Sequence, residues 1–245
     1  QFLKKEFFKN HRDKTSFKNL KQIVTPADKK SEKIIIKILK KHFPKYYIIA
    51  EESQPQLKDA EYFWTVDPID GTTNFSIHQP VFTVAISLFH KNELVLGIIY
   101  APILDEMYWA IKNRGAYKNN KKIRVSKISN LKESILTYNH GQGQRNKNNI
   151  FKIYPHFYKK VHSFQHPYCT SLQLALVAAG HTDGYLVAGA HIWDVAAGII
   201  LVREAGGLVT DWQNRPWQKN SNNLLATNAK IHSLCLKELK KIKLS

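Results

Sequence analysis

The pattern of apolar and polar residues predicts a helix early in the chain. Residues 26–42 carry an apolar stripe with a period of about 3.6 residues, formed by Ile34, Ile35, Ile38 and Leu39. Thr25 before Pro26, with Asp28 close behind, matches a variant of the capping box and marks the helix start. Residues 2–10 suggest the end of another amphipathic helix, whereas residues 11–23 are polar without a period and suggest a mobile loop.

The next apolar runs predict strands, because they are short and are bounded by turn residues. Residues 46–50 lead into Glu51, and residues 62–66 lead into Asp67. Three further runs predict an antiparallel meander with turns at 91–92 and 102–105; they cover residues 81–89, 93–101 and 106–111.

The second half of the chain alternates between helical and strand patterns. The predicted helices are 147–157, 171–180, 195–205 and 229–240, and the predicted strands are 134–138, 184–187, 208–211 and 223–226. Periodicity alone gives a mixed α and β fold. For 245 residues we expect a single domain, 1–245, with a soft subdivision into an N-terminal α+β part, 1–139, and a C-terminal α/β part, 140–245.

Composition narrows the class of protein. Hydrophobic residues make up 43% of the chain, which is enough for a core. No apolar run approaches the roughly 20 residues of a membrane span, and the lysine-rich residues 1–21 lack the apolar segment of a signal peptide. Because the chain starts at Gln1, we expect a few initial residues to be missing. Cys169 and Cys235 make no disulfide framework, so we expect a cytoplasmic protein.

The charge is strongly positive. Lysine and arginine number 37 against 19 acidic residues, a net charge of +18. Such a field attracts anionic substrates and also nucleic acid. The sequence leaves two interpretations open, a lysine-biased composition with solvated charge or a functional basic face.

The segment 67–73 suggests a chemical role. It reads Asp-Pro-Ile-Asp-Gly-Thr-Thr and sets two carboxylates three residues apart around a proline. Mg²⁺ takes oxygen ligands and commonly sits between carboxylates and a substrate phosphate. Gly71 and the threonines after it leave backbone N–H groups unhindered, as a phosphate site requires. One loop therefore suits both metal and phosphate, and the alternative is a turn and helix cap with a structural role.

This segment belongs to an ordered set of motifs. The set resembles the inositol monophosphatase family of Mg²⁺-dependent, lithium-sensitive phosphatases in residues 24–28 (VTPAD), 51–53 (EES), 67–75 (DPIDGTTNF), 193–198 (WDVAAG) and 203–207 (REAGG). Order and spacing agree from about residue 12 to residue 235, so the resemblance covers nearly the whole chain.

The resemblance implies a layered α/β/α/β/α sandwich of the inositol monophosphatase and fructose-1,6-bisphosphatase type. It implies hydrolysis of a small phosphate monoester by water with two or three Mg²⁺ ions. The first ion would be held by Glu51, Asp67 and the carbonyl of Ile69. The second would be held by Asp67, Asp70 and Asp194, and a third, weaker site would use Glu51 with waters. Lithium would compete at the second site.

The resemblance also assigns the remaining roles. Asp28 and Thr72 look like the pair that orients and deprotonates the attacking water, which requires the helix starting at Pro26 to point at the loop. With Glu51 they form the implied catalytic set. Substrate phosphate would meet the N–H groups of Gly71 and Thr72 and lie beside Asp70 and Asp194.

Several of these residues have a structural alternative. Asp28 is favourable at a helix N-terminus in any case, Asp194 is suited to cap a helix that begins at Val195, and Glu52 suits a surface position as well. Trp193 is expected to pack rather than touch substrate. Three histidines lack conventional zinc spacing and are expected at the surface or in packing roles: His156, His162 and His166. An approach of His191 to the substrate stays open.

Two departures from the family pattern concern the substrate. Val187 stands where inositol phosphatases usually have an acid that binds ring hydroxyls, and a valine cannot accept such hydrogen bonds. Residues 168–171 read Tyr-Cys-Thr-Ser where the family commonly has Gly-Ser/Thr-Ala-Ala. The alternatives to inositol monophosphate are fructose 1,6-bisphosphate, histidinol phosphate, a 3′-phosphonucleotide and NADP.

Two other kinds of protein compete with a phosphatase. One is a regulatory protein on the same fold that contacts RNA or the transcription machinery through its basic surface. The other is a phosphatase fold with lost activity. Relatives of this family are commonly dimers, so we expect a homodimer, for which the apolar meander over residues 81–111 offers an interface, and no membrane partner.

Overall fold

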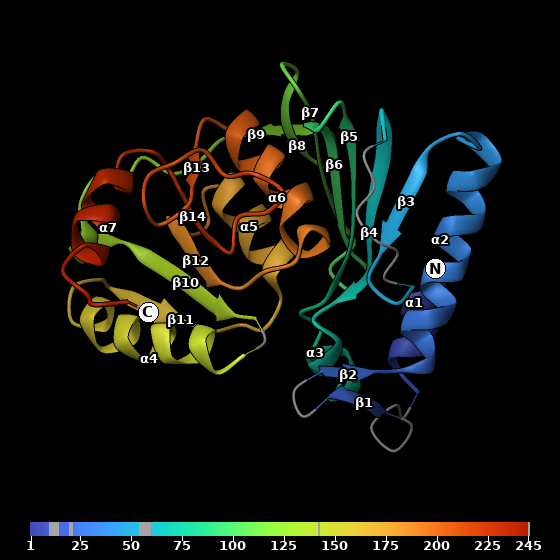
Figure 1. Ribbon diagram of the computed structural model, residues 1–245, viewed down its shortest axis with the longest axis horizontal. Helices are drawn as coiled ribbons and strands as arrows, with labels where there is room; N and C mark the ends of the chain where they lie inside the picture. The colour runs from blue at the N-terminus through green and yellow to red at the C-terminus, as the bar shows by residue number, and fades with distance from the viewer. Residues whose placement is uncertain (10–14, 20–21, 54–59, 142, 245) are drawn as a thin grey trace.

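The computed structural model describes residues 1–9, 15–19, 22–53, 60–141 and 143–244, and the chain folds into five layers (Figure 1). An outer helical layer, a seven-stranded sheet, a central helical layer, a five-stranded sheet and a second outer helical layer follow one another. The predicted α/β/α/β/α sandwich is confirmed. The single domain with its soft subdivision near residue 140 stays a prediction.

The larger sheet contains the predicted meander. Its strands lie in sequence order, and their bounds are β3 (Tyr47–Ala50), β4 (Tyr62–Asp70), β5 (Thr83–His90), β6 (Glu93–Ala101), β7 (Glu106–Ile111), β8 (Gly115–Lys118) and β9 (Lys121–Ile123). All neighbours are antiparallel except β3 and β4. Lys91 and Asn92 join β5 to β6 with φ of 48° and 65°, as a two-residue type I′ hairpin turn requires.

Helix α2 (Pro26–His42) covers the outer face of this sheet and runs along β4, with the short α1 (Phe2–Phe7) beside it (Figure 1). Its start is the predicted capping box. The Thr25 hydroxyl accepts from the N–H of Ala27 at 3.2 Å, and the Asp28 carboxylate accepts from the N–H of Thr25 at 2.8 Å.

The prediction of a loop over residues 11–23 is wrong for its described part. β1 (Ser16–Asn19) and β2 (Gln22–Val24) form an antiparallel hairpin in which Ser16 pairs with Val24. Strands this short carry no readable alternation, so the polar composition concealed them. Residues 10–14 and 20–21 lie outside the described residues.

The smaller sheet begins after a 3₁₀ turn, η2 (Leu131–Glu133). Its spatial order is β11 (Ser163–Gln165), β10 (Ile135–His140), β12 (Gly184–Ala188), β14 (Asn223–Thr227) and β13 (Leu208–Thr210). The first three strands are parallel, and β14 is antiparallel to both of its neighbours. All five residues of β12 are buried, because helices cover both faces of the sheet (Figure 1).

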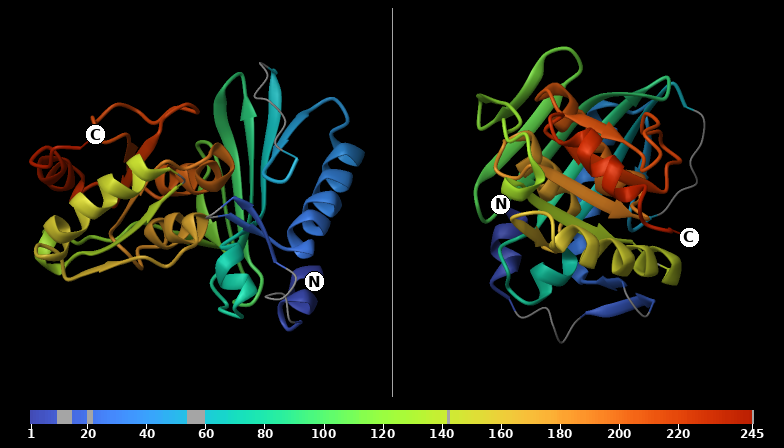
Figure 2. Two further views of the ribbon diagram at one scale, coloured as in Figure 1. Left: turned by 60° about the horizontal axis from the view of Figure 1, so that its bottom comes forward. Right: turned by 90° about the vertical axis from the view of Figure 1, so that its left-hand side faces the viewer.

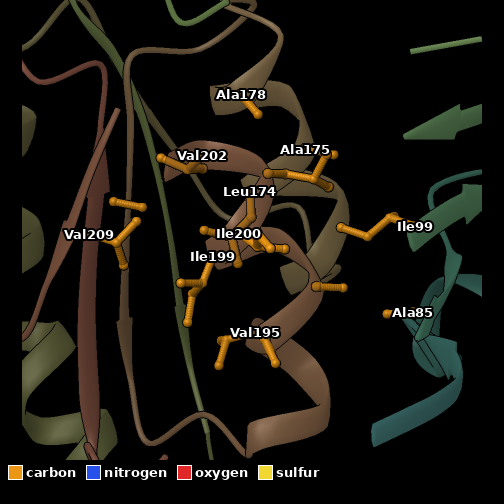
Figure 3. Packing of buried hydrophobic residues seen from close by; sticks show 14 of the residues in the cluster. Ala85, Ile99, Leu174, Ala175, Ala178, Val195, Ile199, Ile200, Val202 and Val209 are labelled. Carbon is orange, nitrogen blue, oxygen red and sulfur yellow. The ribbon is translucent and has the colours of Figure 1, made fainter. Parts of the chain in front are cut away.

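Helices α5 (Thr170–Ala178) and α6 (Ile192–Glu204) fill the space between the two sheets. Figure 3 shows Leu174 and Ile200 between Ile99 of the larger sheet and Val209 of the smaller one. Gly198 allows the two helices to meet, since a Cβ there would lie 2.3 Å from the Cβ of Leu174. Both helices are apolar on almost every side, as their central position demands.

The second outer layer consists of α4 (Gln144–Tyr158) and α7 (His232–Leu239). They lie side by side in front of the strands when the molecule is viewed from that end (Figure 2, right). Ile153 and Phe157 of α4 and Cys235 of α7 are among the residues buried against the smaller sheet. Both cysteines are free, as predicted.

The predicted helices and strands of the second half are present with shifted ends. α6 begins at Ile192 rather than at residue 195, so Asp194 lies in the first turn and is not the N-cap that one alternative proposed. The pattern missed the short elements β8, β9, β11 and α3 (Thr72–Ser76). Across the described residues, no helix combines the length and the apolarity needed to span a bilayer.

Candidate active site

The first site element is a β-bulge at the end of β4. Asp67 pairs with Ala85 and Asp70 pairs with Thr83, so three steps on β4 oppose two on β5. In a regular strand, residues three apart point to opposite faces. The extra residue removes this difference, and both Asp67 and Asp70 line one cavity.

A sharp turn follows the bulge. Gly71 has φ of +90°, and a Cβ there would lie 2.9 Å from the carbonyl oxygen of Val81. Both features require glycine. The turn starts α3, whose first N–H groups have no partner within the helix.

Asp28 lies directly behind this turn. The Thr72 hydroxyl lies 3.1 Å from Asp28 Oδ1 and 2.9 Å from the carbonyl oxygen of Ile69. Its single proton serves one of these acceptors at a time. The predicted condition is met, because the start of α2 faces the loop. Burial raises the pKa of Asp28 to about 6, against the hydrogen bonds from Thr25 that favour the ionised form.

Glu51 begins the turn after β3, where its N–H donates to the carbonyl of Val66 at 3.1 Å. The turn is held by Glu32, which sequence reasoning missed. Glu32 is buried on α2 and accepts from the N–H of Glu52 at 2.7 Å and from the Ser53 hydroxyl at 2.5 Å. The available signal was its position four residues after Asp28, which places both acids on one face of the helix.

The N-terminus of α5 holds the Asp70 carboxylate. Asp70 Oδ2 accepts from the N–H of Ser171 at 2.5 Å and from its hydroxyl at 2.6 Å, and Oδ1 accepts from the N–H of Thr170 at 3.2 Å. Burial raises the pKa of Asp70, and the hydrogen bonds from Ser171 and Thr170 act against that rise. The unusual residues 169–171 therefore fix an acid of the metal loop.

Asp194 reaches the site from the first turn of α6. Its carboxylate accepts from the N–H of His191 at 2.9 Å. A capping role therefore exists at N3, and it leaves Asp194 at the cavity wall. Trp193 stacks on His191, with ring centroids 4.7 Å apart.

These elements enclose a cavity of about 400 Å³. Its acidic wall consists of Glu51, Asp67, Asp70 and Asp194, beside Ile69, Gly71 and Thr72. The remaining lining residues are Asn139, His140, Gly141, Lys147, Tyr168, Thr170, Val187, Ala190 and His191. Sequence reasoning did not foresee Asn139, His140 or Lys147, because β10 and α4 are distant in the chain.

The acids affect one another strongly. Asp67 is buried, and its pKa is raised well above the usual range by burial and then by the charges of Glu51, Asp70 and Asp194. Carboxylates gathered in this way are costly without a cation. The all-oxygen donor set suits Mg²⁺.

The donor atoms of this site suit a metal ion, but they are not arranged as a preformed coordination sphere. Within the described ranges, no three His, Cys, Asp or Glu side chains form a ready-made metal site. Asp70 points toward Ser171, and the Ile69 carbonyl accepts from Thr72. Each carboxylate nonetheless has about four lone-pair sites, so the acids retain the capacity to bind a hard cation.

A family model described as the inositol monophosphatase family matches residues 1–244. The chain belongs to the inositol monophosphatase family. It is accordingly a phosphoric monoester hydrolase, and phosphatases of this family depend on Mg²⁺.

Individual relatives agree with this membership. The chain is 32% identical over 242 residues to a fructose-1,6-bisphosphatase/inositol-1-monophosphatase of Aquifex aeolicus, covering 98% of this chain and 90% of the relative. It is 36% identical over 219 residues to the Nus factor SuhB of Pasteurella multocida, covering 89% and 82%. The crystal structure of the extragenic suppressor protein suhB from Bartonella henselae superposes with a TM-score of 0.92 at 34% identity, covering 98% of this chain and 93% of that one.

Proposed function

We propose that this family member hydrolyses a small phosphate monoester with two or three Mg²⁺ ions. The convergence of Glu51, Asp67, Asp70 and Asp194 on one cavity supports this proposal most directly. Glu51, Asp67 and the Ile69 carbonyl would hold the first ion, and Asp67, Asp70 and Asp194 the second. Glu51 with waters would hold a third. Bound Mg²⁺ supplies charge neutralisation on the phosphoryl oxygens and acidifies water.

The attacking water is activated by Thr72 and Asp28. The 3.1 Å contact between them supports a relay in which the Thr72 hydroxyl takes a proton from the water as it passes its own proton to Asp28. The raised pKa of Asp28, about 6, suits a group that takes a proton near neutral pH. Thr25 holds the other carboxylate oxygen, so Oδ1 stays directed at Thr72.

The substrate phosphate binds at the start of α3. Gly71 and Thr72 offer N–H groups there, and Asp70 and Asp194 lie on the same cavity wall. For the remainder of the ester, relatives named inositol-1-monophosphatase and fructose-1,6-bisphosphatase indicate a small polyol or sugar phosphate. Val187 lines the cavity and cannot accept from ring hydroxyls, so histidinol phosphate, 3′-phosphonucleotides and NADP stay as candidates.

Phosphate release from a panel of esters tests the proposal. The panel contains inositol 1-phosphate, fructose 1,6-bisphosphate, histidinol phosphate, adenosine 3′,5′-bisphosphate and NADP, each with and without Mg²⁺. We expect release that needs Mg²⁺ and is lost in Asp67→Asn. Lithium should inhibit by competing at the second metal site. Release from no ester, with Mg²⁺ binding intact, would contradict the proposal.

A second candidate function is regulatory binding to RNA or to transcription machinery. Two observations favour it, the net charge of +18 and the relatives named Nus factor SuhB. Binding of a structured RNA should then weaken steeply with salt, and should persist in Asp67→Asn. Weak binding without salt dependence would exclude this function. Both functions are compatible on one molecule.

We further propose that the protein is a cytoplasmic homodimer. The meander supports an interface, because Leu104, Met107 and Ile111 are large apolar residues exposed along it. Sedimentation of the wild type and of Met107→Glu tests the proposal. We expect the wild type to sediment as a dimer and Met107→Glu to sediment as a monomer. A monomeric wild type at micromolar concentration would exclude the dimer.

A further inference from the structure

An exposed aromatic ring stands at the rim of the cavity in an unusual backbone conformation. Tyr168 has φ of +57° and is 53% exposed, and it lines the cavity. The left-handed region disfavours bulky side chains. Backbone strain of this kind persists where surrounding structure enforces it, and it occurs preferentially at binding sites. A tyrosine in this conformation at the cavity suggests that its ring has a role in binding.

The ring of Tyr168 is supported from behind. His166 stacks on it with ring centroids 3.9 Å apart and planes at 28°, and Tyr138 also stacks on His166, with ring centroids 4.8 Å apart and planes at 23°. Burial, and then the neighbouring His140, lower the pKa of His166 to about 4, so this imidazole is neutral at physiological pH. These three stacked rings, Tyr138, His166 and Tyr168, form a group that we call the Tyr168 shelf.

Hydrogen bonds fix the shelf relative to the metal loop. Asn139 Oδ1 accepts from the backbone N–H of His140 at 2.8 Å, which identifies it as the oxygen. The contact of 2.8 Å to His166 Nε2 therefore makes that nitrogen the donor. The Asn139 amide donates to Thr170 Oγ1 at 3.0 Å, and the N–H of Thr170 donates to Asp70. A chain of hydrogen bonds through Asn139 and Thr170 thus connects the Tyr168 shelf to Asp70.

Part of the cavity lining offers apolar and ring surfaces that suit a planar group, beside the polar Asn139 and Lys147. Val187 and Ala190 are apolar. His140 and His191 add further rings, and His191 is itself stacked on Trp193. A volume of about 400 Å³ accommodates a nucleoside-sized leaving group beside a phosphate.

We propose that the physiological ester carries a planar π-ring on its leaving group and that this ring stacks on Tyr168. The substrate class is therefore a phosphomonoester of a purine nucleoside or of a similar flat heterocycle, and Tyr168 is a specificity-determining residue. This inference rests on the proposed phosphatase function and specifies its substrate.

Two matched esters test the inference. Adenosine 3′-monophosphate and methyl β-D-ribofuranoside 3-phosphate differ only at C1 of the ribose, which carries adenine in the first and a methoxy group in the second. The ratio of their kcat/KM values therefore reports the contribution of the ring. Base–aromatic stacking corresponds to about a 10-fold or larger effect. We expect the wild type with Mg²⁺ to favour the nucleotide by about that factor. If a single imidazole ring is enough for stacking, histidinol phosphate should also be hydrolysed with a higher kcat/KM than the methyl riboside ester.

Variants assign the preference to Tyr168. Tyr168→Phe keeps the ring and should keep the ratio, whereas Tyr168→Leu should reduce the ratio to near one with little change for the methylriboside. Tyr168→Gly removes the ring and also suits the positive φ, so it separates loss of stacking from misfolding. Tyr158→Leu is the control, because this tyrosine is similarly exposed on α4 outside the cavity.

The outcomes separate the two levels of the proposal. Equal kcat/KM values for the two esters, or equal losses for both in Tyr168→Leu, would overturn the stacking inference while the phosphatase function stands. Phosphate release from no ester at all would overturn both.

Discussion

At the scale of single residues, Asp28 combines structural and chemical duties. One oxygen accepts from the N–H and hydroxyl of Thr25, and the other faces Thr72. An amide at this position can still cap α2 but takes no proton. The helix cap and the base are therefore separable by substitution.

We predict that Asp28→Asn lowers kcat by about 10²- to 10⁴-fold, the usual range for loss of a general base. Mg²⁺ binding should change little, because the side chain is not among the proposed ligands. Steady-state kinetics and calorimetric Mg²⁺ titration provide the measurement. Thr72→Ser should remain active and Thr72→Val should not. An Asp28→Asn enzyme with wild-type kcat would remove Asp28 from the mechanism.

A second single-residue feature is a buried neutral histidine far from the site. His232 is buried on α7, where its Nε2 lies 3.0 Å from the Thr210 hydroxyl and its Nδ1 lies 2.9 Å from that of Thr227. The Thr210 hydroxyl donates to the carbonyl of Asp211 at 2.7 Å, so it accepts from His232. Burial lowers the pKa of His232 to about 4.

This shift predicts acid destabilisation. The folded protein favours the neutral imidazole. The contribution of His232 to the free energy of unfolding is therefore complete above the unfolded pKa of about 6.5 and is lost as pH falls toward 4. We expect His232→Gln to be less stable than the wild type at pH 7.5, with that gap shrinking by roughly 2–3 kcal/mol by pH 4.5. Urea unfolding of both proteins at the two pH values measures it. A gap independent of pH would contradict a neutral buried His232.

At the scale of elements, the contact between α5 and α6 determines where two site residues lie. Asp194 lies in the first turn of α6, and α5 holds Asp70 through Ser171. Gly198 lets the helices approach, because a Cβ would lie 2.3 Å from Leu174 Cβ. The distance between the helices is thus part of the geometry of the site.

Gly198→Ala is predicted to destabilise the protein by about 1–3 kcal/mol through overpacking. The sign of the change in the free energy of unfolding shows whether the site is crowded, since alanine in an uncrowded helix is about 1 kcal/mol more favourable than glycine. Urea unfolding gives the free energy of unfolding, and Mg²⁺ titration reports whether the acids move apart. An increase in stability would show that the helices have room at this position.

At the scale of the whole molecule, a protein with a net charge of +18 contains a cavity with an acidic wall. Metal binding compensates the acids locally, while the lysines act at longer range on an anionic substrate. Salt screens this attraction, with a Debye length of about 10 Å at 0.1 M.

We therefore predict that kcat/KM for a phosphate ester falls several-fold between about 0.05 and 0.5 M KCl, at saturating Mg²⁺, while kcat changes little. Electrostatic steering changes the rate at which substrate associates with the enzyme and not the chemical step, so salt should affect kcat/KM more than kcat. Steady-state kinetics over a KCl series measures both constants. An unchanged kcat/KM would indicate that the surface lysines are too distant to influence substrate.

The sequence by itself determined what is local. Asp67, Asp70, Gly71 and Thr72 are neighbours in the chain, so one short segment indicated a turn that suits both metal and phosphate, although it indicated neither the bulge nor α3. Likewise Thr25 and Asp28 specified the start of α2, and the apolar alternation specified the meander. Backbone geometry and short-range hydrogen bonds produce these features, and both can be inferred from residue types at fixed spacing.

Only the tertiary structure decided what approaches across long sequence separations. The contact between Asp28 and Thr72, the support of the Glu51 turn by Glu32 and the stacking of His166 on Tyr168 depend on how the layers pack. No periodicity encodes such contacts, because they follow from the burial of apolar faces rather than from neighbouring residues. Sequence therefore indicated the phosphatase chemistry, and packing built the wall that we propose selects the substrate.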